Sequence, residues 1–332
     1  LLERNGVLSQ DITDLVHPSV AELAALAARI VGLDIAGVDV VATDISRPLE
    51  AQGGAIIEVN AGPGLLMHLE PAVGQPRPVG EAIVEHLMGP DNSGRIPVVG
   101  ISGVEHTTAV AMLTGWLLYR AGYTTGLACN AGMYLQMDKI ETASPGEWES
   151  GQRILMNRTT TAAVIESSPR SILENGLAYD RCQVGVVTGL PEPVGLEDHH
   201  IHSHEQMRTV LRTQIDVVLP TGCAVLNADD AACAGLAELC DGSVLFYTVN
   251  ADHELRAEHC AQETGRFLVV REQQIVLLGH QTETPVMDLR HPVVERLLQQ
   301  HLPLPALLAA VGAALALEMD PALVRAGVET AE

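Results

Sequence analysis

The chain has 332 residues, and its 42 acidic and 19 basic side chains give a formal net charge of −23 at pH 7. Nucleic-acid backbones are bound by Lys and Arg, and single strands also by stacked aromatic side chains, which make up only 3% of this chain. The composition therefore argues against nucleic acid as a partner. Hydrophobic residues make up 47% of the chain, which predicts a globular protein, and the length predicts about two domains.

The longest apolar run predicts a buried helix and no membrane span. It covers residues 307–317, fewer than the ~20 residues that cross a bilayer. The six cysteines are widely spaced without a Cys-x-x-Cys pair, which favours a reducing, cytoplasmic compartment. No charged and then apolar leader opens the chain, so no export signal is expected, and a start at Leu1 rather than Met is typical of a fragment.

The first part of the chain predicts a helix, a hairpin and a second helix. The elements expected from apolar periodicity and β-branched runs are a helix over 21–31, strands over 36–42 and 55–60, and a helix over 79–88. A Gly-, Pro- and Asn-containing stretch follows. We therefore expect a first domain over 1–89, a linker over 90–94 and a second domain over 95–332.

The second part alternates buried strands with helices. Strands are predicted over 96–101, 161–166, 184–188, 223–227, 243–247 and 267–271, and helices over 107–121 and 305–332. Such alternation favours an α/β fold with a largely parallel sheet.

Three oxygen-bearing side chains fall on the predicted hairpin. Glu58 and Asn60 share one face of their strand because side chains alternate, and the facing strand can bring Asp39 beside them. Two carboxylates and an amide oxygen suit Mg²⁺, which usually links one or two carboxylates to nucleotide phosphates. The alternative is that Glu58 and Asn60 are the solvent-facing half of an alternating strand, and spacing alone does not decide between the two.

The motif around these residues resembles the last part of an ATP-grasp ligase domain. It reads Gly-Val-Asp-Val over 37–40 and Glu-Val-Asn-Ala-Gly-Pro-Gly over 58–64. In that family the Asp, Glu and Asn hold the magnesium ions of ATP, so the resemblance implies the same role for Asp39, Glu58 and Asn60. The segments at 44–49 and 67–71 narrow the resemblance to the cyanophycin synthetase family, which joins an ATP-grasp domain to a Mur-ligase-like domain.

The resemblance to the cyanophycin synthetase family continues through 180–188, 224–230 and 324–327. It implies an α/β chain in which the C-terminal subdomain of an ATP-grasp fold precedes a Mur-ligase-like central domain. The implied activity is ATP-dependent carboxylate–amine ligation, through an acyl phosphate, that builds a polymer of aspartate and arginine. The implied cofactors and partners are ATP, Mg²⁺, the growing polymer and either β-aspartyl-arginine or the free amino acids, in a homo-oligomer.

The phosphate loop of the Mur-like part departs from its family pattern. That pattern is Gly-x-x-Gly-x-x-Gly-Lys-Thr-Thr, whereas residues 100–108 read Gly-Ile-Ser-Gly-Val-Glu-His-Thr-Thr and lack the last Gly and the Lys. Such loops aim backbone N–H groups and an ammonium at phosphate oxygens. A carboxylate repels phosphate instead, by roughly 4 kcal/mol at ~4 Å and an effective dielectric of ~20. We therefore predict a degenerate, non-functional phosphate loop made of Gly100, Gly103, Glu105, His106 and Thr107.

Two further departures point the same way. Residues 167–174 replace a family Ala-Arg-Gly-Gly segment with Pro169 and Ser171 at the glycine positions, and Thr188-Gly189 replaces a family Thr-Asn. The Mur-like half is thus expected to keep its fold and to have lost ligation. This resembles the shorter second type of cyanophycin synthetase, which joins β-aspartyl-arginine dipeptides at one ATP-grasp centre.

Other candidate residues carry weaker signals. His68 follows the glycine-containing loop and could meet substrate, although the family commonly has Arg where Leu66 stands. The four imidazoles between His199 and His204 could bind a metal, but a solvated histidine-rich loop is the alternative.

No catalytic residue is assigned from the sequence. A non-catalytic scaffold or binding module derived from a Mur ligase is the alternative function, and an active Mur-like ligase with an unusual phosphate loop is a third hypothesis.

Overall fold

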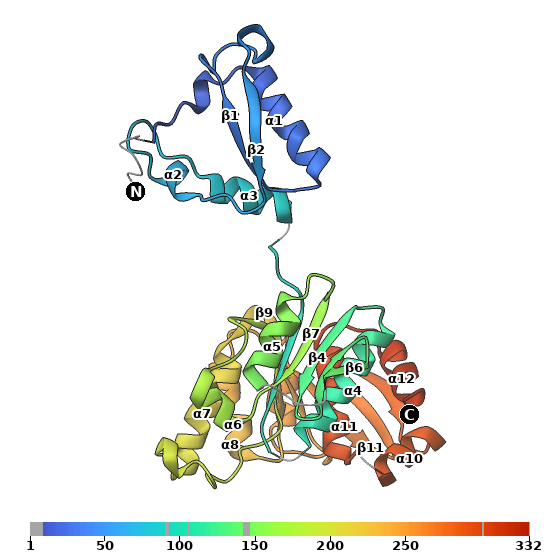
Figure 1. Ribbon diagram of the computed structural model, residues 1–332. Coiled ribbons are helices and arrows are strands. Elements are labelled where there is room, and N and C mark those ends of the chain that lie inside the picture. Colours follow the sequence, from blue (N-terminus) through green and yellow to red (C-terminus); the bar gives the residue numbers. More distant parts are fainter. Residues whose placement is uncertain (1–8, 90–92, 105, 142–146, 301, 332) are drawn as a thin grey trace. The chain divides into compact units, whose positions relative to one another are not determined.

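The computed structural model describes residues 9–89, 93–104, 106–141, 147–300 and 302–331 (Figure 1). Residues 90–92 of the predicted linker and Glu105 of the predicted phosphate loop lie outside the described residues. The chain forms two compact units, Leu1–Arg95 (unit 1) and Ile96–Glu332 (unit 2). No helix among the described residues combines the length and apolar character that a membrane span needs.

Unit 1 contains the predicted helices and hairpin. Its elements are η1 (Thr13–Leu15), α1 (Pro18–Val31), β1 (Gly37–Val41), η2 (Glu50–Gln52), β2 (Ala55–Asn60), α2 (Leu66–Leu69) and α3 (Val79–Met88). Helix α1 begins after His17, whose side chain accepts a hydrogen bond from the backbone N–H of Ser19, and it ends at Gly32 in the left-handed conformation that glycine favours. Strands β1 and β2 pair antiparallel, with a register shift between Asp39 and Val40.

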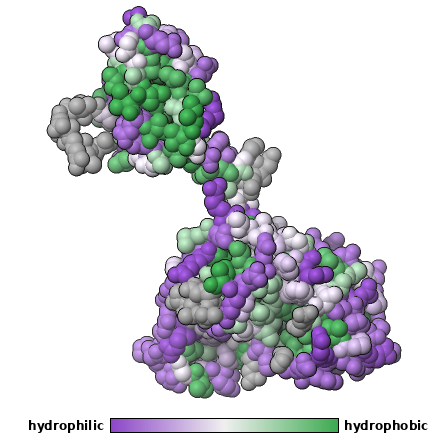
Figure 2. Space-filling model, turned by 45° about the vertical axis from the view of Figure 1, so that its right-hand side comes forward, coloured by the Kyte–Doolittle hydropathy of each residue, from purple (hydrophilic) through white to green (hydrophobic). Residues whose placement is uncertain are grey.

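Unit 1 leaves much apolar surface exposed. Within residues 9–89 only Val20 and Leu49 are hydrophobic residues that are fully buried. The exposed large hydrophobic residues of this unit are Ile12, Leu15, Leu23, Leu26, Ile30, Val31, Val41, Ile57, Leu66, Met67, Leu69, Val73, Val84, Leu87 and Met88. Figure 2 shows apolar residues gathered on one face of it. A two-stranded sheet with few helices cannot enclose a core of ordinary size.

Unit 2 is built on one eleven-stranded sheet. In spatial order the strands are β13 (Thr282–Asp288), β12 (Gln274–Gly279), β11 (Arg266–Arg271), β10 (Ser243–Tyr247), β9 (Val218–Asn227), β8 (Cys182–Val187), β3 (Val98–Ser102), β7 (Ala162–Glu166), β4 (Thr125–Cys129), β5 (Gly132–Leu135) and β6 (Asp138–Glu141). The strands from β11 to β4 run parallel, and the strands beyond them at both edges pair antiparallel. The predicted α/β fold with a mostly parallel sheet is confirmed.

Helices cover both faces of this sheet. They are α4 (Thr107–Arg120), α5 (Glu147–Met156), α6 (Pro169–Asn175), α7 (His204–Asp216), α8 (Ala231–Ala234), α9 (Arg256–Ala261), α10 (Pro292–Gln300), α11 (Leu304–Ala316) and α12 (Pro321–Glu329), with short turns η3 (Glu197–His199) and η4 (Gly235–Leu239). Helices α4, α11 and α12 share one core with the sheet, and α6 and α7 share a second core. Every residue of α11 from Ala306 to Ala316 is buried, which confirms the predicted buried helix.

Gly100 lies inside the central strand β3 and is fully buried, so it is not part of the loop that we predicted to include it. A Cβ at this position would come within 1.8 Å of Tyr179 Oη and 2.5 Å of Gln214 Nε2. Those two buried side chains are hydrogen-bonded, with Tyr179 Oη donating to Gln214 Oε1 at 2.8 Å. Glycine is therefore required here by packing.

We expect Gly100→Ala to destabilise unit 2 by about 1–3 kcal/mol, because the added methyl group collides with a buried polar pair. In urea unfolding followed by circular dichroism, Tyr179→Phe should recover part of this loss in the Gly100→Ala background. Gly235→Ala is the control, since its nearest neighbour would be 4.0 Å away at Arg208 Nη2. Equal stabilities of the two alanine variants would contradict the packing explanation.

Candidate functional site

The hairpin of unit 1 brings the predicted metal ligands together. Asp39 is the direct register partner of Glu58, and Gly37 is the partner of Asn60. Glu58 and Asn60 lie two residues apart on β2, so they share a face, and directly opposed residues in an antiparallel pair have Cβ atoms about 4.5–5.5 Å apart. The two carboxylates and the amide are thus neighbours on one sheet face.

These three side chains are available for a ligand. Asp39 and Glu58 are exposed and Asn60 is half-buried. Within the described part of the chain, none of the three side chains forms a hydrogen bond or an ion pair. A Cβ at Gly37 would lie 2.9 Å from Pro63 Cβ, so the loop that follows Asn60 packs closely against the start of β1.

His68 lies on the short helix α2, and its side chain is exposed. Its backbone carbonyl accepts a hydrogen bond from the N–H of Arg77 at 2.8 Å. Its contact with substrate stays a prediction.

The loop after β3 is hydrogen-bonded to Thr188, the residue that directly follows the neighbouring strand β8. The backbone N–H of Val104 donates to Thr188 Oγ1 at 3.1 Å, and a Cβ at Gly103 would lie 2.3 Å from the same hydroxyl. His106 has the left-handed conformation (φ 69°) and occupies the position before the first residue of α4, without a side-chain capping hydrogen bond. One N–H group that a phosphate loop would aim at its ligand is therefore already used within the protein.

Glu166 ends β7 beside this loop and is only 2% exposed. It accepts hydrogen bonds from Thr107 Oγ1 (2.7 Å), from Thr108 Oγ1 (2.9 and 3.0 Å), and from the backbone N–H (2.8 Å) and side-chain Nδ2 (3.0 Å) of Asn130. The sequence reasoning missed this residue. Its signal was an acidic residue at the carboxyl end of a buried parallel strand, where α/β proteins place their sites.

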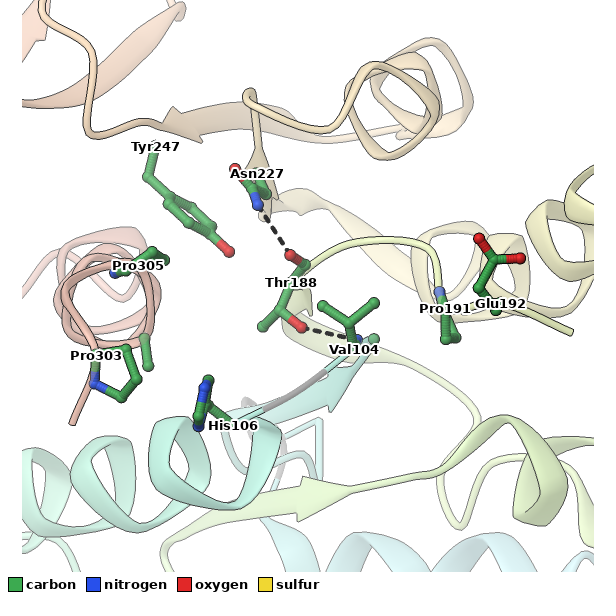
Figure 3. Close-up of a pocket in the computed structure, with 11 residues that line it drawn as sticks. Val104, His106, Thr188, Pro191, Glu192, Asn227, Tyr247, Pro303 and Pro305 are labelled. Carbon is green, nitrogen blue, oxygen red and sulfur yellow. Dashed lines mark hydrogen bonds between the residues drawn. The ribbon is translucent and has the colours of Figure 1, made fainter. Parts of the chain in front are cut away.

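A cavity of about 710 Å³ opens at the carboxyl ends of β3, β8, β9 and β10 (Figure 3). Its lining residues are Gly103, Val104, His106, Thr188, Pro191, Glu192, Asn227, Tyr247, Pro303, Pro305 and Ala306. Cavities of this size hold small-molecule ligands in other proteins. The lining contains no Lys or Arg among the described residues.

Tyr247 is the second residue that the sequence reasoning missed. It is 1% exposed, and its hydroxyl points into the cavity (Figure 3). Within the described residues the hydroxyl has no hydrogen-bond partner. Burial raises the pKa of Tyr247 well above its usual value, so the hydroxyl stays protonated and can donate.

The histidine-rich segment takes part in ion pairs. Arg170 Nη1 and Nη2 contact the two carboxylate oxygens of Asp198 at 2.9 and 3.1 Å, and His199 Nε2 lies 3.3 Å from Glu174 Oε1. His204 Nε2 lies 3.0 Å from Glu192 Oε2. The described residues contain no group of three His, Cys, Asp or Glu side chains that could hold a metal ion.

The six cysteines are all free. Burial raises the pKa of Cys129 to about 11 and that of Cys182 to about 12, so both thiols are protonated and poorly nucleophilic at neutral pH.

The chain is similar to several known ligases. It is 37% identical over 255 residues to the cyanophycin synthetase of Crocosphaera subtropica. The matched region covers 76% of this chain and 29% of that protein. It is 36% identical to the enzyme of the same name from Trichormus variabilis, with 76% and 28% covered. The chain thus spans less than a third of the length of these curated relatives. No protein-family model matches it.

A shorter match is 38% identical over 79 residues to the glutathione biosynthesis bifunctional protein GshAB of Clostridium perfringens, and it covers 24% of this chain and 10% of that protein. Among solved structures, a UDP-N-acetylmuramoyl-L-alanyl-D-glutamate–2,6-diaminopimelate ligase superimposes with a TM-score of 0.52 at 14% identity. The superposition covers 76% of this chain and 49% of the ligase. This likeness shows that the fold resembles that of Mur ligases.

We expect Glu166→Gln to destabilise unit 2 by about 1–3 kcal/mol, because an amide nitrogen would face donors that now bind a carboxylate oxygen. Glu149→Gln on the exposed side of α5 is the matched control and should change stability by less than about 0.5 kcal/mol. Urea unfolding measures both. A Glu166→Gln variant as stable as the control would show that these donors find other acceptors.

Proposed function

Because the chain is related to the cyanophycin synthetases over three quarters of its length, we propose that it acts as part of an ATP-dependent carboxylate–amine ligase of cyanophycin biosynthesis. Its substrates are β-aspartyl-arginine, or aspartate and arginine, together with the growing polymer, and the reaction passes through an acyl phosphate. The enzyme is a homo-oligomer in this proposal.

Unit 1 then forms the C-terminal part of an ATP-grasp domain, over residues 1–89. Its exposed apolar residues support this assignment, since contiguous apolar surface of this extent is typical of a face that another part of a protein covers. Residues 95–332 form a Mur-ligase-like domain, an assignment supported by the similarity to a Mur ligase structure.

Asp39, Glu58 and Asn60 would hold Mg²⁺ in this enzyme. The observation that carries the assignment is the direct pairing of Asp39 with Glu58 on a face shared with Asn60. The donor set consists of oxygen atoms without protein partners among the described residues, which is what a hard cation requires. When bound, the ion neutralises charge on the phosphate oxygens during transfer.

In this proposal unit 2 no longer catalyses ATP-dependent ligation. Its role is in the assembly of the oligomer or in the handling of the polymer. Three observations support the loss: Val104 N–H is bonded to Thr188, Glu166 is saturated by protein donors, and the described lining of the neighbouring cavity carries no Lys or Arg. The single ATP centre is therefore the one to which unit 1 contributes.

The test is ATP turnover by a protein that carries both units and the remaining ATP-grasp segments, measured with and without β-aspartyl-arginine. We expect Glu58→Ala to lower turnover by at least about 100-fold, since loss of groups that merely orient a metal ligand already costs 10- to 100-fold. Glu58→Gln keeps the shape and should raise the Mg²⁺ concentration needed for half-maximal turnover.

The control is Glu22→Ala, which removes an exposed carboxylate on α1 and should leave turnover unchanged. Undiminished turnover in Glu58→Ala would disprove the metal assignment. If the parent protein itself fails to turn over ATP, the ligase proposal is wrong and a non-catalytic scaffold becomes the better description.

A further inference from the structure

The loop between β1 and β2 is too long to set the pairing of these strands by itself. It covers residues 42–54 and includes the short turn η2. Hairpin loops usually contain about two to five residues, and the length and type of the turn then fix the strand register. In a longer loop, contacts inside the loop must fix the register instead.

One side chain, that of Gln52, supplies most of these contacts with six hydrogen bonds. Its Oε1 accepts from the N–H and the hydroxyl of Thr43 at 2.9 and 2.8 Å, and from the N–H of Asp44 at 2.8 Å. Its Nε2 donates to the carbonyl oxygens of Asp44, Arg47 and Pro48 at 2.7, 3.0 and 3.2 Å. The amide of Gln52, near the start of β2, is thus bonded to the residues that follow β1.

The same loop is anchored to the rest of unit 1. The N–H of His17, at the start of α1, donates to the carbonyl of Ile45 at 3.0 Å. The N–H of Gly54 donates to the carbonyl of Leu49 at 2.9 Å, and Leu49 is only 4% exposed. The loop that Gln52 closes is therefore held against α1 and joined directly to the start of β2.

The register that this loop sets decides where the predicted magnesium ligands lie. Val41 pairs with Ala55 next to the loop, and Asp39 pairs with Glu58 further along the hairpin. A slip of one residue moves the side chains of a strand to its other face, so it would separate the two carboxylates. Gln52 bonds the loop and not the ligands, and it acts on the ligands through the strand pairing.

We propose that Gln52 is a positioning residue for the metal site of unit 1. Its amide closes the loop and thereby keeps the carboxylates of Asp39 and Glu58 opposite each other. The inference rests on the proposed function, because it takes Asp39, Glu58 and Asn60 to be the magnesium ligands. Groups that orient metal ligands without touching the ion typically change metal affinity or activity by about 10- to 100-fold.

The test is a titration with Mn²⁺, which suits the same oxygen ligands as Mg²⁺ and is followed by electron paramagnetic resonance. The protein is the one that carries both units and the remaining ATP-grasp segments. Gln52→Met keeps the length of the side chain and removes all six hydrogen bonds, and we expect it to weaken Mn²⁺ binding about tenfold. Thr43→Val is a milder variant that removes only one of these bonds and should weaken binding about threefold.

Hydrogen exchange followed by mass spectrometry reports the strand pairing independently of the metal. We expect the amides of residues 37–41 and 55–60 to exchange faster in Gln52→Met, and to a smaller extent in Thr43→Val, because the pairing of β1 with β2 is then less firmly held.

Asp11→Ala is the matched control, because its side-chain bonds lie outside the hairpin. Asp11 Oδ2 accepts from Arg77 Nε at 2.9 Å, and Asp11 Oδ1 accepts from the N–H and the hydroxyl of Thr13 at 3.2 and 2.6 Å. This variant should lower the stability of unit 1 in urea unfolding and leave both the Mn²⁺ affinity and the exchange of the hairpin unchanged.

Two further results separate this inference from the proposed function. If Glu58→Ala abolishes Mn²⁺ binding but Gln52→Met binds as tightly as the parent, or no more weakly than Asp11→Ala, the positioning role is wrong and the metal site stands. If Glu58→Ala binds Mn²⁺ as tightly as the parent, the metal assignment is wrong, and this inference is wrong with it.

Discussion

A carboxylate held almost out of water must be satisfied by hydrogen bonds, and Glu166 imposes this requirement on the centre of unit 2. Its donors are Thr107 and Thr108 at the start of α4 and Asn130 in the turn between β4 and β5. One buried carboxyl group thereby fixes the first turn of a long helix and the edge of the parallel sheet relative to β7. The start of the loop between β3 and α4 is bonded to Thr188, and Glu166 holds the residues at its end, Thr107 and Thr108.

In the proposed function unit 2 differs from a nucleotide-binding α/β domain, and the contacts of the described residues after β3 support this difference. Thr188 Oγ1 accepts a hydrogen bond from the N–H of Val104, and Thr188 packs against Gly103. This N–H is therefore bonded within the protein. The cavity beside it remains open, and Tyr247 directs a hydroxyl into it. The proposed loss of phosphate binding is therefore compatible with the retention of a cavity, because the two depend on different residues. In unit 1 the side-chain oxygen atoms of Asp39, Glu58 and Asn60 remain without protein partners among the described residues.

The strands of the sheet centre were predictable because each is a short, continuous apolar run between turn residues. Strand β4 was not predicted, and the edge strands β5, β6, β12 and β13 were missed for a specific reason. The turns that join β5 to β6 and β11 to β12 have positive φ at both central residues, Gln136 and Met137 in one and Glu272 and Gln273 in the other. Hairpin turns of this kind usually carry Asn or Gly at the central positions. Gln, Met and Glu at these positions do not indicate a hairpin turn in the sequence.

The sequence by itself determined the hairpin and the two long helices of unit 1, six strands of the sheet of unit 2 and the neighbourhood of Asp39, Glu58 and Asn60, because apolar runs, strand alternation and a short hairpin set those positions locally. Only the tertiary structure decided that Gly100 serves packing, that Glu166 meets Thr107 across 59 residues, and that the Tyr247 hydroxyl opens into a cavity. These contacts depend on which strands become neighbours in the sheet. Local periodicity carries no information about that order, because every buried parallel strand has the same apolar pattern.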